Sequence, residues 1–195
     1  DLLAGKPAER GDFIEKPYAS TVAKAGERLT ATLRRDGTVR SADGAERSVA
    51  ISKQVSLDGA SGEFAVLYSL KNTSSSALET LFGVEFNVAG MSPDMNDSFY
   101  HTGNRQPVAS MLSEMEFADL ATLGLLNRHG GFNTTFVFTS PPEIWLFPVK
   151  TFSRSEDGLD IIYQCSTILP HWRITLEPGK TWEMVITFKT EELST

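Results

Sequence analysis

Apolar and polar side chains alternate along most of this sequence. Residues 81–88 show the alternation most clearly, because every second side chain in them is apolar. A period of two is typical of a strand with one buried face. The same period recurs over 49–57, 64–70, 134–139, 144–148, 161–168 and 182–189. The pattern predicts about eleven or twelve strands and no long amphipathic helix.

Turn residues separate these predicted strands. Asp36-Gly37 lies between 30–34 and 38–41, and it predicts a hairpin because both residues tolerate positive φ. Residues 177–180 carry Pro and Gly in the order that a type II turn requires. Many strands joined by such turns favour an all-β fold, a large antiparallel two-sheet β-sandwich with less than about a tenth of its residues in helices.

The first residues and one internal stretch depart from the period of two. Residues 1–18 are polar and interrupted by prolines and glycine, so we expect a leading segment or linker over 1–20 and a single sandwich domain over 21–195. Residues 89–116 predict a long loop, with one or two helical turns within 108–115.

Composition narrows the classes of partner. The chain has 195 residues, 41% of them hydrophobic, and a net charge of -7, which argues against disorder and against nucleic acid as a partner. No apolar stretch approaches the roughly 20 residues of a membrane span, and no signal peptide is visible. We therefore expect a cytoplasmic protein.

The single cysteine, Cys165, cannot form an internal disulfide and is expected to be a buried structural residue.

Four stretches carry a family resemblance in their order along the chain: Gly11–Tyr18, Leu81–Asn87, Pro142–Val149 and Tyr163–Gly179. The chain resembles the C-terminal β domain of glycoside hydrolase family 57 α-amylases and 4-α-glucanotransferases. The resemblance implies a supersandwich of the galactose mutarotase type, placed after an N-terminal catalytic (β/α) barrel of the same parent chain. It also implies that the catalytic carboxylates lie in that barrel.

Three functions are compatible with the resemblance and the pattern. The first is a non-catalytic C-terminal domain of an enzyme acting on α-1,4-glucans, which supports the barrel and can contribute to carbohydrate binding. The alternatives are an autonomous carbohydrate-binding module and a mutarotase-like sugar epimerase. For the first function we expect an uncovered apolar face near Phe13, Pro17 and Tyr18, with an α-glucan oligosaccharide and a second copy as further candidate partners.

Five side chains are candidates for carbohydrate contact: Glu85, Asn87, His101, Trp145 and Trp172. Glu85 and Asn87 share one face of a predicted strand, which is either a sugar-binding surface or an ordinary polar sheet face. The two tryptophans can stack on pyranose rings, although tryptophan more often packs in a core. A mutarotase-like enzyme needs a histidine and a carboxylate as acid and base, and His101 with Glu85 is the pair that we single out.

We expect neither a metal nor a cofactor. The histidines at 101, 129 and 171 lack the i, i+4 spacing of a helical zinc site, and no phosphate-binding glycine loop occurs. Asp94, Asn96 and Asp97 offer clustered oxygen atoms that calcium could use. Solvated loop carboxylates are the simpler interpretation of that cluster, because the remaining residues of an EF-hand are missing.

Overall fold

The computed structural model describes residues 9–89, 91–155 and 158–193, and these residues form strands and no helix. The strands belong to two antiparallel sheets, one with nine strands and one with five. The expected all-β, two-sheet architecture is confirmed. The described part of the chain accordingly has no helix of the length and apolarity that a membrane span requires. Contacts divide it into two compact units, which are described in turn.

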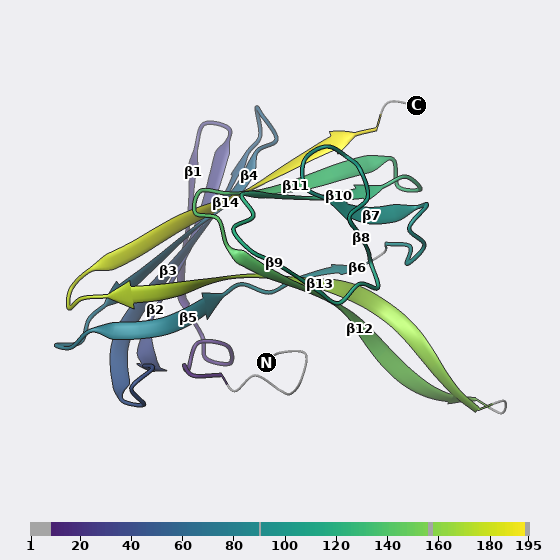
Figure 1. Cartoon of the computed structure of the whole chain (residues 1–195). Helices are drawn as coiled ribbons and strands as arrows, with labels where there is room; N and C mark the ends of the chain where they lie inside the picture. Colours follow the sequence, from purple (N-terminus) through teal and green to yellow (C-terminus); the bar gives the residue numbers. More distant parts are fainter. Residues whose placement is uncertain (1–8, 90, 156–157, 194–195) are drawn as a thin grey trace. The chain divides into compact units, whose positions relative to one another are not determined.

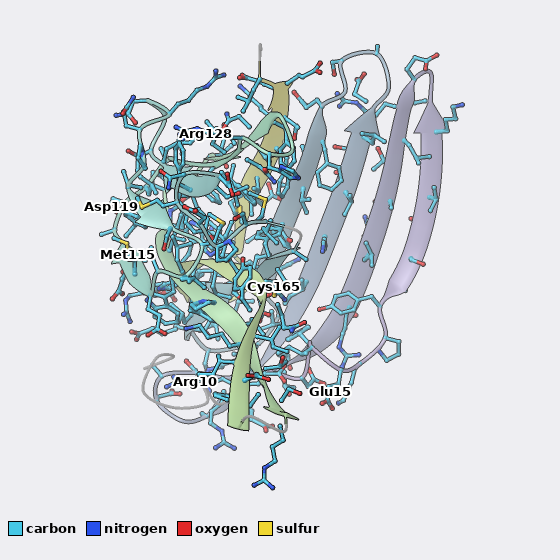
Figure 2. The ribbon with its side chains drawn as sticks, turned by 90° about the vertical axis from the view of Figure 1, so that its right-hand side faces the viewer. Arg10, Glu15, Met115, Asp119, Arg128 and Cys165 are labelled. Carbon is cyan, nitrogen blue, oxygen red and sulfur yellow. The ribbon has the colours of Figure 1, made fainter. Side chains whose placement is uncertain are left out.

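The first unit comprises residues 9–82, 138–140 and 172–188. Five of its strands lie side by side in the order β1, β2, β3, β4, β14, each antiparallel to its neighbour (Figures 1 and 2). Their bounds are Ala19–Ala25, Arg28–Arg40, Glu46–Asp58, Phe64–Asn72 and Thr181–Glu192. The unit also contains β5, Leu78–Gly83, up to Phe82, and the end of β13, Gly158–Leu176.

The hairpin expected at Asp36-Gly37 is wrong, because both residues lie inside β2 and pair with Ala50 and Val49 of β3. The chain instead turns at Gly26 and Gly44, which have φ values of 59° and 82°. The glycine at 37 serves close packing rather than a turn, since the leading segment lies directly over it. The turn expected over 177–180 is confirmed by a positive φ at Gly179 and a 3.0 Å bond from the Lys180 N–H to the Glu177 carbonyl.

One face of this five-stranded portion forms the core of the first unit. Val66, Leu70 and Ile186 are each at most 2% exposed on it. The opposite face carries polar side chains, as the alternation of the sequence predicted. An aromatic cluster completes the core, with ring centroids 5.5–6.3 Å apart between its members: Phe82, Phe138, Trp172 and Trp182.

The second unit comprises residues 83–137, 141–171 and 189–193. One of its groups of strands has the order β11, β10, β7, β8, with bounds Phe132–Phe138, Thr122–Asn127, Ser98–His101 and Ala109–Ser110. In the other group, β13 pairs with both β6 and β12, and β12 pairs with β9. The bounds of β6, β9 and β12 are Phe86–Ala89, Met115–Phe117 and Glu143–Ser155.

Two predictions about this part of the chain were wrong. The strand expected over 81–88 is interrupted at Val84 and Glu85, where the Val84 N–H donates to the Pro170 carbonyl at 3.0 Å. The alternation of exposure nevertheless continues through the break. The helical turns expected within 108–115 are absent, because this stretch holds β8, a turn closed by Ser113 N–H on the Ser110 carbonyl, and the start of β9.

Strands β12 and β13 pair with each other from Glu143↔His171 to Ser155↔Gly158, as Figure 1 shows, with one register shift after Val149. They are longer than the separate short strands that the sequence predicted over 144–148 and 161–168. Ile144, Leu146 and Ile168 are fully buried on one face. The odd-numbered side chains from 143 to 147 therefore share the other face with those of β13 from 167 to 171.

Candidate functional site

Three rows of side chains cross this second face of β6, β13, β12 and β9. The strand register defines the rows, because directly opposed residues point to the same side of a sheet. The members are His171 and Glu143 in the first row, Leu169, Trp145 and Glu116 in the second, and Asn87, Thr167 and Phe147 in the third. We call this set the Trp145 face.

Trp145 is held from two sides. Its ring centroid lies 4.0 Å from that of His171, with a 40° angle between the planes. Its indole Nε1–H donates to Oε1 of Glu116 at 2.8 Å. These two contacts hold the half-buried indole in one rotamer. The side of the ring that faces away from His171 therefore keeps a fixed orientation. A ring that is already oriented costs less entropy when a flat ligand packs against it.

His171 lies beneath Trp145 and is 1% exposed. Its Nδ1 is 3.2 Å from the Leu169 carbonyl, and its Nε2 is 3.2 Å from the Glu143 carboxylate. Both partners only accept hydrogen bonds, so the two contacts are hydrogen bonds at the same time only when both ring nitrogens carry protons. The pair is a salt bridge only when the His171 ring is protonated.

Asn87 forms the second half of the face. Its Nδ2 donates to Oε1 of Glu85 at 2.8 Å, and its Oδ1 accepts from the Thr167 hydroxyl at 2.7 Å. Glu85 and Asn87 are both exposed, as the sequence predicted. The pair presents a carboxylate and an amide to solvent in a fixed relation, which is the kind of polar group that orients sugar hydroxyls.

Cys165, which Figure 2 labels, lies on β13 two residues before Thr167 and on the same face. It is a free thiol and is half-buried, so the expectation of a buried cysteine is wrong. Its Sγ is 4.0 Å from Oδ1 of Asn87. The alternation of the strand assigns it to the outer face, and the neighbouring polar residues leave it partly accessible.

His101 lies elsewhere in the second unit, buried to 1% exposure on β7. The Gly103 N–H donates to its Nδ1 at 3.1 Å, so its Nε2 carries the proton and donates to Oδ1 of Asn133 at 2.7 Å. Both ring nitrogens therefore have partners within the chain. Its hydrogen bonds go to Gly103 and Asn133, and Glu85 bonds to Asn87, so the geometry does not form the acid–base pair of a mutarotase-like site.

Trp172 belongs to the first unit and is 6% exposed. Its Nε1–H donates to the Ser140 carbonyl at 2.9 Å, and its ring packs with Phe82, Phe138 and Trp182. Of the five candidates for carbohydrate contact, the structure brings Glu85, Asn87 and Trp145 to one surface. It places His101 and Trp172 in cores.

Sequence reasoning did not find Glu116, Glu143, Thr167 and His171 as members of the Trp145 face. Glu143 directly precedes the strand predicted over 144–148, so its shared face with Trp145 follows from the period of two once the strand includes it. The remaining members come from strands whose pairing with β12 the sequence does not reveal.

The loop oxygens considered for calcium bond to one another and to their own loop. Oδ1 of Asp94 accepts from the Asn96 backbone N–H and side-chain amide at 2.9 and 3.0 Å, and Asp97 accepts from the Ser92 hydroxyl at 3.1 Å. No group of three or more histidine, cysteine, aspartate or glutamate side chains within the described residues is arranged to hold a metal ion.

Comparison with known families gives a match over almost the whole chain. The family described as Alpha-amylase/4-alpha-glucanotransferase, C-terminal, matches residues 1–186. Alpha-amylase 1 of Dictyoglomus thermophilum is 27% identical over 124 residues, which is 63% of this chain and 17% of that protein. The 4-alpha-glucanotransferase of Thermococcus kodakarensis is 28% identical over 158 residues, 80% of this chain and 19% of that protein.

Solved structures share the fold. The 4-alpha-glucanotransferase of Thermococcus litoralis superposes with a TM-score of 0.65 and 24% identity, over 94% of this chain and 24% of that one. A galactose mutarotase-like protein of Clostridium acetobutylicum gives a TM-score of 0.57 at 13% identity, over 90% and 67%. These likenesses confirm the galactose mutarotase-like fold. This chain spans less than a fifth of the length of the two curated relatives. The family match shows that the chain belongs to the C-terminal domains of the α-amylase/4-α-glucanotransferase family.

Proposed function

We propose that this chain is an accessory domain of an enzyme acting on α-1,4-glucans, and that another part of the parent chain performs the reaction. The match to a C-terminal family and the greater length of the relatives support this division of labour. In this account the chain docks on the N-terminal catalytic barrel and stabilises it. The mutarotase-like proteins share the fold alone, and fold does not decide function.

An uncovered apolar surface in the first unit carries the proposal. Leu29 and Leu57 are opposed across β2 and β3, and Val22 of β1 lies on the same side. They are 45%, 46% and 69% exposed, whereas Val66 and Ile186, further along that side, are buried. The apolar face of the sheet therefore continues beyond the part that the chain itself covers. Adjacent exposed apolar side chains of this kind mark a contact surface.

The leading segment, residues 9–18, places Asp12 and Phe13 on the same side of β2. Asp12 accepts a 2.7 Å bond from Arg35 and a 3.0 Å bond from the Thr38 N–H. The Phe13 ring lies under the Arg35 guanidinium, 5.7 Å from its central carbon. This anchoring supports docking, because it holds Asp12 and Phe13 on the face that carries the apolar surface. In a longer chain, the preceding domain is therefore connected near that face.

Variants of the longer parent chain test the docking. Leu29→Ser and Leu57→Ser should lower the melting temperature of the parent and separate its unfolding into two transitions, as scanning calorimetry would record. The matched control is Leu81→Ser, because Leu81 is 43% exposed and lies on β5. Equal effects of all three substitutions, or none, would count against docking through this face.

We also propose that the Trp145 face contacts an α-glucan oligosaccharide when the parent binds its substrate. A half-buried indole beside an exposed amide and carboxylate supports this role. Glu85, Asn87 and Trp145 carry the proposal, and the buried His101 and Trp172 do not. Calorimetric titration of the isolated chain with maltoheptaose should give a Kd of about 1 mM or weaker, near −4 kcal/mol. A low-micromolar value would instead favour an autonomous carbohydrate-binding module.

A homodimer and a cytoplasmic location remain parts of the same proposal. The uncovered apolar surface supports self-association as an alternative use of one face. Sedimentation of the parent chain tests the first, and fractionation of the source cells tests the second.

A further inference from the structure

The polar face of the first unit is hollowed. The hollow has a volume of about 760 Å³ and lies over β2, β3, β4 and β14, reaching β1 at Ala19. Figure 2 shows strands β1 to β4 side by side. We call the hollow the basin. It lies on the side of the sheet opposite to Leu29 and Leu57, because most of its β2 and β3 residues, such as Arg34, Ser52 and Gln54, have even numbers.

The register explains why the sheet is hollow there. One row across the five strands consists of Ala19, Arg34, Ser52, Ser69 and Glu183. The middle positions, Ser52 and Ser69, are short, and the adjoining Ala50 is short as well. The surrounding positions carry longer polar side chains: Arg34, Asp36, Gln54, Lys71 and Glu183. The floor spans four strand spacings, roughly 19 Å, which accommodates several sugar rings in succession.

Arg34, Asp36, Gln54, Lys71 and Glu183 make no hydrogen bond or ion pair with any described residue, whereas Arg35, which also lines the basin, pairs with Asp12. Some other carboxylates of the same unit have partners: Asp58 pairs with Arg28, and Asp43 pairs with Arg47. Ala50 and Ser52 of β3 separate the β2 pair, Arg34 and Asp36, from Lys71 and Glu183 on the other side of the floor.

This chemistry favours a neutral ligand rich in hydroxyl groups. Three cations and two anions line the basin, and the Asp12 carboxylate pairs with one of the cations, Arg35, so the basin does not select for an anionic or a cationic ligand. Its side chains supply both donors and acceptors, which hydroxyl groups match in either role. A volume of 760 Å³ lies within the range of small-molecule sites.

We propose that the basin binds a segment of an α-glucan, separately from the Trp145 face. The proposal rests on the proposed function for the choice of glucan. No aromatic ring among the described residues lines the basin, so affinity comes from hydrogen bonds that replace those of water and is weak. A site of this kind holds a long substrate near the enzyme. It thereby raises the effective concentration of that substrate at the catalytic site.

Nuclear magnetic resonance titration of the chain with maltoheptaose tests the proposal. Backbone amide signals of Ser52, Gln54, Ser69 and Lys71 should shift together and saturate in the millimolar range. Ser52→Ile fills the floor with a residue that strands favour, and Gln54→Ala removes a donor and acceptor without filling it. Ser52→Ile should weaken binding at the basin at least tenfold, and Gln54→Ala should weaken it by a smaller factor. Trp145→Ala should leave the basin signals unchanged.

Three results would overturn the basin site. Maltoheptaose at tens of millimolar could leave the four signals unmoved, or Ser52→Ile could leave the titration unaltered although the variant is folded. Sodium sulfate could shift the same signals more strongly than maltoheptaose, which would identify an anion site. None of these results bears on the proposed docking of the parent chain. Calorimetry of Leu29→Ser and Leu57→Ser tests that docking independently.

Discussion

A methyl group added to Gly37 would overlap the carboxylate of Asp12. It would also lie 2.8 Å from Cζ of Phe13. The leading segment therefore rests on a strand that has no side chain at the point of contact. Since Oδ1 of Asp12 accepts from the Thr38 N–H, the carboxylate cannot move away without losing that bond.

Gly37→Ala should displace the leading segment from β2. We expect a loss of about 1–3 kcal/mol in the free energy of unfolding, typical of an overpacked contact, measured by urea titration. Proteolysis within residues 9–18 should become faster. Gly83→Ala is the control, because a methyl group there would meet its nearest atom, Cβ of His171, at 3.6 Å. Unchanged proteolysis in Gly37→Ala would contradict the packing described.

Acid should release the same anchor. The Lys16 ammonium, the Thr38 N–H and the Arg35 guanidinium hold the pKa of Asp12 well below its usual range. A depressed folded-state pKa means that the ionised carboxylate stabilises the fold above the unfolded pKa of about 3.9, and that this contribution fades as pH falls below it. The stability difference between wild type and Asp12→Asn should therefore be constant near neutrality and shrink below about pH 4. Urea midpoints measured from pH 7 to pH 2.5 would show this, and a difference independent of pH would refute it.

Two tyrosines should respond oppositely to loss of the hydroxyl group. The Tyr68 hydroxyl is buried without a hydrogen-bond partner among the described residues, and burial raises its pKa to about 12. The Tyr163 hydroxyl bonds to Oγ of Ser166 at 2.6 Å. Tyr68→Phe should therefore raise the free energy of unfolding by about 1 kcal/mol, and Tyr163→Phe should lower it by a similar amount. Urea unfolding measures both, and destabilisation by Tyr68→Phe would show that its hydroxyl has a partner.

The period of two was sufficient to predict the class of fold and the exposed positions of Glu85 and Asn87. It could not distinguish a turn glycine from a packing glycine, because Gly37 meets residues that are distant in sequence. The Trp145 face shows the same limit. Glu116, Trp145 and Leu169 become neighbours through strand pairing across 29 and 24 residues, and local sequence carries no record of that pairing. The same limit applies to Trp172, which the sequence left as either a core residue or a carbohydrate contact. Alternation separates the two faces of a strand, but it does not show which of them is buried.

The central claim is that the catalytic centre lies outside this chain. The direct measurement is incubation of labelled maltoheptaose with the purified chain and, in parallel, with the longer parent protein, at several pH values. We predict that the parent cleaves or transfers glucosyl units and that the chain alone does neither. Retaining glycosidases need two carboxyl groups about 5 Å apart, one protonated and one ionised. Turnover by the chain alone that disappears in Glu85→Gln would contradict the account and place a catalytic centre on the Trp145 side of the second unit.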